Sequence, residues 1–293
     1  MLNKELVNEV VEIIEVIIDG MNSKVIVNEV VKNNNTKLTG VCIMLENENI
    51  FPTVYLENYD LTSSNVREVA VQIISDSYRA RLEMPKIDTD KLLTPEYIKN
   101  NAIIRLINYK ANEEMLRTTP HIRFFDLAIV CYVNVGYNGA IRLDDNIFKT
   151  LYIPKDELFY IANTNTQNIF SPKGRNMEEI FFGIESKHKE LSTFNMDNPL
   201  PMYVLTNAES VYGATTILYD GLLEELSNQT KTDLIIIPSS VHEVILVPKI
   251  DGVEVDKITE MVQEVNGGQV APEERLSDHA YIYNRFTGQI EMN

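Results

Sequence analysis

The amino-acid sequence predicts an α+β protein, with mainly antiparallel sheets and helices packed on them. Segments rich in β-branched residues follow one another closely, and between two of them stands only Pro238-Ser239-Ser240. So short a connection cannot carry a crossover between parallel strands. Segments with apolar residues at three- and four-residue steps, typical of helices, flank these strands. Neighbouring strands joined this tightly favour α+β over a doubly wound parallel sheet.

A small N-terminal unit of helix, three strands and helix is predicted over residues 1–90. Residues 4–19 have the apolar stripe of a buried helix, and Gly20 is suited to the left-handed conformation that ends it. Pro52 would place the third strand at a sheet edge or make it start after the proline. Asn65 and Glu68 have capping-box spacing at the start of the second helix. The predicted strands are 24–31, 38–45 and 51–56, and the second helix is 64–82.

A larger α+β unit is predicted over residues 91–293, after proline and aspartate interrupt the pattern at 84–96. Asp144-Asp145 and Pro154-Lys155-Asp156 each resemble a helix start. The irregular segment 171–200 is expected to be a loop with one short helix, and a lid is the alternative. The predicted strands are 102–108, 125–135, 202–206, 213–219, 233–237, 241–247 and 279–284. The predicted helices are 111–117, 220–229 and 256–265, and Gly267 and Gly268 would cap the last of them.

The composition excludes several classes of protein. The chain has 293 residues, of which 43 are acidic and 26 basic, for a net charge of −17. The clustered Lys and Arg residues that displace phosphate counterions are absent, so no direct binding of nucleic acid is expected. No apolar run approaches the roughly 18 residues of a membrane span, and the charged N-terminal segment does not have the apolar core of a secretory signal. A cytoplasmic location is therefore expected.

No metal and no cofactor are expected either. Cys42 and Cys131 lie in separate apolar segments, and their spacing matches neither a disulfide framework nor a zinc site. Both are expected to be buried free thiols. The four histidines share no metal-ligand spacing. The sequence also has no P-loop, dinucleotide fingerprint or nucleophile elbow.

Two segments carry candidate catalytic residues. Ser240 and His242 would share one side at the start of the predicted strand 241–247, where they could form a nucleophile and its base. Asp278 could orient His279, as a carboxylate does in a catalytic triad. The commoner alternative is structural for both segments. Ser240 would then satisfy turn backbone groups, and Asp278 would belong to a capped turn.

His121 and Arg123 are candidate binding residues in the segment 119–130. His121 follows Pro120 in a loop-like position, and Arg123 stands close enough to Asp126 for a local ion pair. Arg123 could instead anchor an anion. Anchoring of the core is again the commoner role for such residues.

Six stretches of the sequence together resemble one known family. They are VVKNNNTKLTGV, PTVYLENY, PHIRFFDLAIV, LPMYVLTN, PSSVHEVILVP and APEERLSDHAYIYNR, and the resemblance covers about residues 24–286. The family is an uncharacterised bacterial one, found mainly in gut Clostridia and described as the domain of unknown function numbered fifty-six eighty-eight. This resemblance implies a cytosolic bacterial protein, often associated with mobile elements. It brings no established activity and no catalytic residues.

Three kinds of function remain open. The leading hypothesis is a non-enzymatic binding or regulatory protein that works through a protein partner, because the chain is acidic, has two parts and matches no enzyme template. A hydrolase or transferase of unrecognised type, using Ser240 and His242 with Asp278 and His279, is the second. The third is an acidic decoy that imitates a nucleic-acid backbone.

Overall fold

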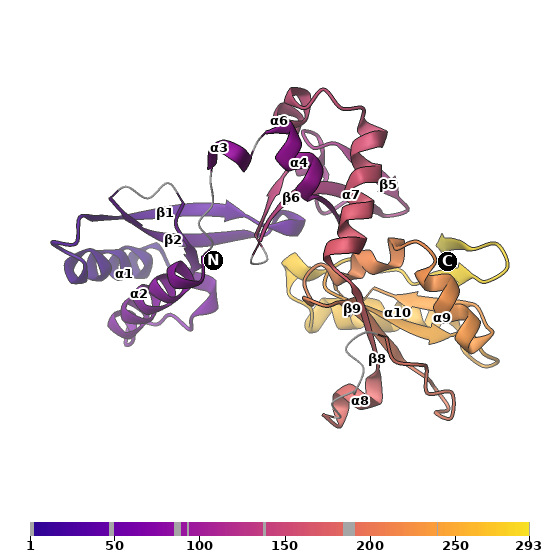
Figure 1. The fold of residues 1–293 in the computed structure, drawn as a ribbon. Helices are drawn as coiled ribbons and strands as arrows, with labels where there is room; N and C mark the ends of the chain where they lie inside the picture. The colour runs from indigo at the N-terminus through magenta and orange to yellow at the C-terminus, as the bar shows by residue number, and fades with distance from the viewer. Residues whose placement is uncertain are drawn as a thin grey trace. The chain divides into compact units, whose positions relative to one another are not determined.

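The computed structural model describes residues 3–46, 50–84, 89–92, 94–136, 139–183, 191–238 and 240–292. Its contacts divide the chain into two compact units, Met1–Asp88 and Thr89–Asn293. Figure 1 shows the helices and strands of each. Helices and antiparallel sheets make up both units, so the predicted α+β class is confirmed.

The first unit is a three-stranded antiparallel sheet with two helices against it (Figure 1). Its sheet order is β1-β2-β3, so the strand after Pro52 lies at an edge, as predicted. Val25 of β1 pairs with Ile43 of β2, and both face a core that also holds Ile14 and Ile73 of the helices. Gly20 follows the first helix with a φ of +82°, the left-handed conformation that ends it. The elements are α1 (Lys4–Ile17), β1 (Ser23–Val31), η1 (Asn33–Asn35), β2 (Lys37–Leu45), β3 (Thr53–Tyr55), η2 (Leu56–Asn58) and α2 (Val66–Glu83).

The predicted capping box at the start of α2 is wrong. Asn65 is the N-cap residue, but its side chain makes no capping hydrogen bond. Its Oδ1 accepts from the Thr62 backbone N–H at 2.8 Å, and its Nδ2 donates to the Asp60 carbonyl at 2.7 Å. The amide therefore closes the preceding turn, since an Asn side chain can satisfy turn backbone as readily as a helix end.

The second unit has two antiparallel sheets. The smaller has the order β4-β6-β5, and β7 also pairs with β6. The larger has the order β13-β12-β10-β11-β9-β8. The strands are β4 (Ala102–Asn108), β5 (His121–Phe124), β6 (Leu127–Gly136), β7 (Gly139–Arg142), β8 (Pro172–Asn176), β9 (Tyr203–Asn207), β10 (Leu234–Ile237), β11 (Val244–Pro248), β12 (Tyr281–Asn284) and β13 (Gln289–Met292). The antiparallel pairing of β10 with β11 confirms the prediction drawn from their short connection.

Helices cover both faces of the larger sheet. On one face, Leu226 of α9 packs in a core with Ile236, and on the other face Val262 of α10 packs with Ile235. Helix α7 lies against the smaller sheet, where Phe159 packs with Cys131. The helices of this unit are α3 (Thr89–Leu92), α4 (Pro95–Asn101), α5 (Glu113–Leu116), α6 (Asp145–Thr150), α7 (Lys155–Ile169), α8 (Met177–Phe181), η3 (Gly213–Leu218), α9 (Leu222–Thr230), α10 (Val255–Gly268) and η4 (Pro272–Glu274).

The predicted strand 213–219 is wrong, because these residues form the 3-10 helix η3. Its β-branched residues fill the core, and their hydroxyls satisfy backbone groups. Thr216 Oγ1 donates to the Gly213 carbonyl at 2.7 Å, and Thr215 Oγ1 accepts from the Leu106 N–H of β4 at 3.2 Å. Threonine thus supports a buried turn here, although its intrinsic preference is for strands.

Other predictions for the second unit also differ from the structure. The strand predicted over 241–247 begins at Val244, because the Val241 N–H donates to the Glu274 carbonyl outside the sheet, at 2.8 Å. Gly267 and Gly268 are the last two residues of α10. Neither has the left-handed conformation of the predicted cap. The irregular segment 171–200 holds β8 and α8, and its residues 184–190 lie outside the described part of the chain. Strands β5, β7, β8 and β13 were not predicted.

Both cysteines, Cys42 and Cys131, are free and buried, as predicted. In the part of the chain that the structure describes, no helix is long and apolar enough to cross a membrane.

Candidate functional site

An arginine held between two tyrosine rings stands out on the smaller sheet. Arg105 of β4 lies on the same sheet face as Tyr132, because β4 pairs with β6 in a register that places Ile103 opposite Tyr132. Its guanidinium carbon is 4.6 Å from the centroid of the Tyr132 ring and 3.9 Å from that of Tyr212. Each such cation–π contact stabilises by about 0.5 to 2 kcal/mol, depending on desolvation. The two rings therefore fix the position of the charge.

The charge of Arg105 has no acidic partner among the described residues. Burial lowers the pKa of the guanidinium, and Tyr212 and Tyr132 oppose this change. An arginine nevertheless stays protonated at any physiological pH. Burial raises the pKa of Tyr132, and the charges of Arg105 and Arg142 act in the opposite direction. A buried cation without a carboxylate is costly, so its environment favours an incoming anion.

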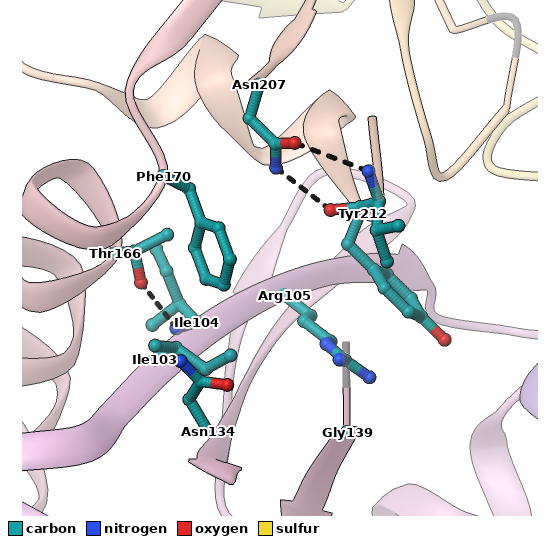
Figure 2. Close-up of a pocket in the computed structure, with 10 residues that line it drawn as sticks. Ile103, Ile104, Arg105, Asn134, Gly139, Thr166, Phe170, Asn207 and Tyr212 are labelled. Carbon is teal, nitrogen blue, oxygen red and sulfur yellow. Dashed lines mark hydrogen bonds between the residues drawn. The ribbon is translucent and has the colours of Figure 1, made fainter. Parts of the chain in front are cut away.

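A small cavity of about 20 Å³ adjoins Arg105, enough for one water-sized group (Figure 2). Two of its polar side chains are already satisfied. Asn207 donates to the Val211 carbonyl at 2.9 Å and accepts from the Val211 N–H, while Thr166 Oγ1 accepts from the Ile104 N–H at 2.8 Å. The cavity is lined by Ile103, Ile104, Arg105, Asn134, Gly139, Thr166, Phe170, Asn207, Val211 and Tyr212.

Unused hydrogen-bond donors lie at this cavity and on the neighbouring strand β7. Asn134 Oδ1 accepts from the Gly136 N–H at 3.1 Å, and its Nδ2 has no hydrogen-bond partner among the described residues. A β-bulge between Asn134 and Gly136 shifts the register of β6 at this point. Arg142 of β7 pairs with Tyr132 on the same sheet face, and its Nε is buried without a partner. Arg105, Asn134 and Arg142 are hereafter called the donor cluster.

Tyr212 reaches Arg105 from a strained loop. Its φ is +52°, a left-handed conformation that bulky residues rarely adopt. The imidazole Nδ1 of His242 accepts from the Tyr212 N–H at 3.3 Å, and the two rings are tilted with centroids 5.7 Å apart. Beside it, a Cβ on Gly213 would lie 2.1 Å from Thr206 Oγ1 and 2.5 Å from the His242 carbonyl oxygen. The next residue must therefore be glycine, and the loop is held tightly in this shape.

Ser240 and His242, the predicted catalytic pair, lie in one turn, and their contact stabilises the turn backbone. Ser240 Oγ accepts from the His242 backbone N–H at 3.0 Å, and no hydrogen bond joins the hydroxyl to the imidazole. Because Nδ1 accepts from Tyr212, the imidazole proton is on Nε2, which faces Glu274 Oε1 at 3.6 Å. Nδ1 therefore already accepts a hydrogen bond, while Nε2 faces a carboxylate beyond hydrogen-bond distance.

Asp278 and His279 do not pair with each other in the structure. Asp278 Oδ1 accepts from Asn266 Nδ2 of α10 at 2.9 Å. The His279 N–H donates to Ser277 Oγ at 2.9 Å, which places the histidine in a turn. No contact joins these residues to Ser240 or His242 among the described parts of the chain. The four candidate catalytic residues thus lie in two separate turns.

The candidate binding residues His121 and Arg123 lie on β5, away from the loop-like position expected for His121. The Nδ1–H of His121 donates to the Thr119 carbonyl at 2.8 Å. The Arg123 Nε donates to the Phe125 carbonyl, and its guanidinium carbon lies 3.6 Å from the centroid of the Tyr109 ring.

The ion pair expected between Arg123 and Asp126 does not form. Asp126 instead accepts from two hydroxyls, Ser277 Oγ at 2.7 Å and Tyr281 OH at 2.5 Å. In the described residues, no group of three or more His, Cys, Asp or Glu side chains is placed to hold a metal ion.

The family of the chain follows from a match along nearly its whole length. A model described as "Family of unknown function (DUF5688)" matches residues 3–285. The chain belongs to this family. The match runs through both compact units of the chain. No curated protein and no solved structure matches the chain.

Sequence reasoning missed the donor cluster, although one signal was present. Arg105 is the single charged residue in the apolar strand AIIRLIN (102–108), and a charge in such a strand calls for a partner or a function. Its ring partner Tyr212 comes from a loop far along the chain, just before the segment 213–219 that reads as a strand. The sequence of this chain therefore indicates the buried cation but not the tyrosine rings that contact it.

Proposed function

We propose that the chain is a non-enzymatic binding protein that recognises an oxyanion, carried by a protein partner, through the donor cluster. The observation that carries this proposal is the guanidinium of Arg105, which lies between two tyrosine rings without a carboxylate partner. Guanidinium groups bind carboxylate and phosphate oxygens through paired, charge-assisted hydrogen bonds. Rings that hold the group in place reduce the entropy lost on binding.

The chemistry of the cluster supports an anion over a cation or a neutral group. Arg105, Arg142 and the amide nitrogen of Asn134 all offer donors and no free acceptor. The chain carries a net charge of −17, so its long-range field repels anions. A local pair of arginines overcomes that field only at short range, which favours selective recognition over general attraction.

The size of the cavity supports a group presented by a larger molecule. About 20 Å³ accommodates one oxygen-sized group and not a whole metabolite. The remainder of the ligand would therefore lie outside the cavity, as it does when a side chain of a partner protein is recognised. A cytoplasmic, bacterial setting is part of this proposal.

The hydrolase or transferase alternative has less support in the geometry. Such an enzyme needs a base within hydrogen-bond reach of its nucleophile. Nδ1 of the His242 imidazole accepts from the Tyr212 N–H, and Ser240 Oγ accepts from the His242 backbone N–H, with no hydrogen bond between hydroxyl and ring. The acidic decoy stays a prediction that no contact of the described residues favours.

Thermal unfolding in the presence of simple anions tests the proposal. The full chain is heated with inorganic phosphate or acetate, and chloride keeps the ionic strength constant. A tenfold excess over the Kd stabilises the folded state by about 1.4 kcal/mol, which raises the Tm by roughly 3 to 5 °C. Arg105→Gln should abolish this rise. Arg117→Gln, which removes an exposed arginine of the same unit, should keep it.

Equal stabilisation of the wild type and Arg105→Gln by both anions would contradict the proposal. So would the absence of any rise in the wild type up to about 100 mM anion, because a Kd above that corresponds to less than about 1.4 kcal/mol of binding free energy.

A further inference from the structure

A second pocket, of about 220 Å³, lies beside the larger sheet of the second unit. It opens on the side of β8 and β9, where Lys173 pairs with Thr206 and Arg175 pairs with Val204. Glu243 directly precedes β11, the strand on the other side of β9. The pocket is lined by Lys173, Gly174, Arg175, Ile180, Val204, Thr206, Ser210 and Glu243.

The charges of this pocket are separated rather than paired. Among the described residues, Lys173, Arg175 and Glu243 make no ion pair, although all three line the same space. The Nε of Arg175 is buried and has no hydrogen-bond partner. Lysine or arginine beside glutamate on a surface readily forms a contact, so this separation leaves two cations and one anion free to bind a ligand.

The remaining lining supplies one hydroxyl and an apolar wall. Ser210 has a left-handed φ of +55°, and its hydroxyl makes no hydrogen bond with the described residues. Thr206 Oγ1 is engaged, since it donates to the His242 carbonyl at 2.7 Å. Ile180, exposed over 46% of its surface, and Val204 provide apolar contact. The pocket therefore offers cationic, anionic and apolar parts within a space smaller than most drug-sized sites.

We propose that this pocket binds a free α-amino acid in its zwitterionic form. The carboxylate would contact Lys173 and Arg175, and the ammonium would contact Glu243 with help from the Ser210 hydroxyl. An aliphatic side chain would lie against Ile180 and Val204. A ligand with a single charge would satisfy only one side of the pocket and leave the other without a partner, which costs affinity.

This pocket is distinct from the donor cluster, which offers donors only. Arg105 can bind the carboxylate of a zwitterion or of a simple anion equally well. Glu243 instead favours the zwitterion, because it can contact the ammonium group. The inference therefore does not depend on the proposed oxyanion function, and the two can fail separately.

Calorimetric titration of the full chain with L-leucine tests the inference. Two analogues serve as matched ligands: 4-methylpentanoate, which has no ammonium group, and L-leucinamide, which has no carboxylate. L-leucine should bind saturably, and each analogue should bind at least about tenfold more weakly, the factor that corresponds to about 1.4 kcal/mol. A panel of other L-amino acids then defines the preferred side chain.

Variants assign the binding to this pocket. Glu243→Gln and Lys173→Gln should each weaken L-leucine binding by about tenfold or more, while Arg105→Gln should leave it unchanged. Circular dichroism checks that each variant is folded. If either Glu243→Gln or Lys173→Gln does not fold, the other one tests the assignment. The inference is overturned if no amino acid of the panel binds at concentrations up to about 10 mM. It is also overturned if 4-methylpentanoate binds as tightly as L-leucine, or if Glu243→Gln has no effect.

Discussion

The hydroxyl of Tyr281 donates a hydrogen bond of 2.5 Å to the Asp126 carboxylate, which joins the two sheets of the second unit. Asp126 lies in the turn between β5 and β6, and Tyr281 begins β12. The second carboxylate oxygen accepts from Ser277 Oγ at 2.7 Å. One carboxylate thus accepts from two buried hydroxyls, one in β12 and one in the segment just before it.

Replacement of this carboxylate should destabilise the second unit. Asp126→Ala leaves the Tyr281 hydroxyl without an acceptor and Ser277 Oγ with only the His279 carbonyl at 3.4 Å, so the unfolding free energy should fall by about 1 to 3 kcal/mol. Asp197→Ala, at an exposed position, should change it by less than about 0.5 kcal/mol. Urea denaturation followed by circular dichroism measures both values. An unchanged midpoint for Asp126→Ala would show that the contact contributes nothing.

A buried tyrosine should make the stability fall in alkaline solution. Burial raises the pKa of Tyr203 to about 12 from an ordinary value near 10. Above pH 10 the unfolded chain loses this proton and the folded chain keeps it. The unfolded state then binds fewer protons than the folded state. The contribution of Tyr203 to the unfolding free energy is therefore complete below pH 10. It falls by about 1.4 kcal/mol per pH unit until pH 12.

Comparison with a variant isolates this effect. Between pH 10 and 12, Tyr203→Phe should lose stability with pH less steeply than the wild type. Tyr160→Phe, at a tyrosine that is 74% exposed, should match the wild-type slope. Parallel slopes for the wild type and Tyr203→Phe would refute the prediction.

Glycine substitutions should act in opposite directions at two positions. Gly213→Ala places a Cβ 2.1 Å from Thr206 Oγ1 and 2.7 Å from the Asn207 nitrogen, so it should destabilise by about 1 to 3 kcal/mol or more. Gly267→Ala meets nothing within 4 Å in α10 and should stabilise by up to about 1 kcal/mol. Denaturant midpoints measure both, and a stable Gly213→Ala protein would contradict the tight packing of this loop.

The C-terminal end of α9 offers a stabilising substitution. Lys231 caps this helix with a left-handed φ of +60°, a conformation that costs a non-glycine residue about 1 kcal/mol. Lys231→Gly should therefore raise the unfolding free energy by about 0.5 to 1 kcal/mol. Lys257→Gly, inside α10, should lower it by a similar amount. A loss of stability in Lys231→Gly would refute this assignment of strain.

The two buried thiols report on the two units separately. Cys42 belongs to the first unit and Cys131 to the second, and they are 3% and 1% exposed. Each unit has its own hydrophobic core, so the two thiols should become reactive at different urea concentrations. Maleimide labelling of single-cysteine variants, read by mass spectrometry, measures this. Identical labelling midpoints would mean that the units unfold as one.

Much of the fold could be predicted from local sequence patterns. The apolar periodicity of residues 4–19 and the position of Gly20 depend on neighbours within one or two turns, and both predictions are confirmed. The strand predicted over 213–219 was wrong because tertiary packing buries its β-branched residues in a 3-10 helix. Threonine hydroxyls satisfy the backbone of that helix. The capping role predicted for Asn65 was wrong for a related reason, since its side-chain amide bonds to backbone in the preceding turn.

The candidate site was less predictable, because it depends on contacts between distant segments. The sequence placed emphasis on histidines next to carboxylates, but neighbours along a chain seldom have the geometry of a catalytic pair. His242 instead supports Tyr212, and Tyr212 holds Arg105. The charge in an apolar strand was visible, while the rings around it became apparent only from the fold.

The most direct test of the account is the NMR signal of the Arg105 Nε–Hε group. Its resonance, assigned with Arg105→Lys, is titrated with phosphate and separately with acetate at constant ionic strength. The account predicts a saturable shift with at least one anion, while exposed Arg117 changes only slightly and linearly. A resonance of Arg105 that stays unchanged with both anions, or that moves in proportion to the exposed arginine, would contradict oxyanion recognition at the donor cluster.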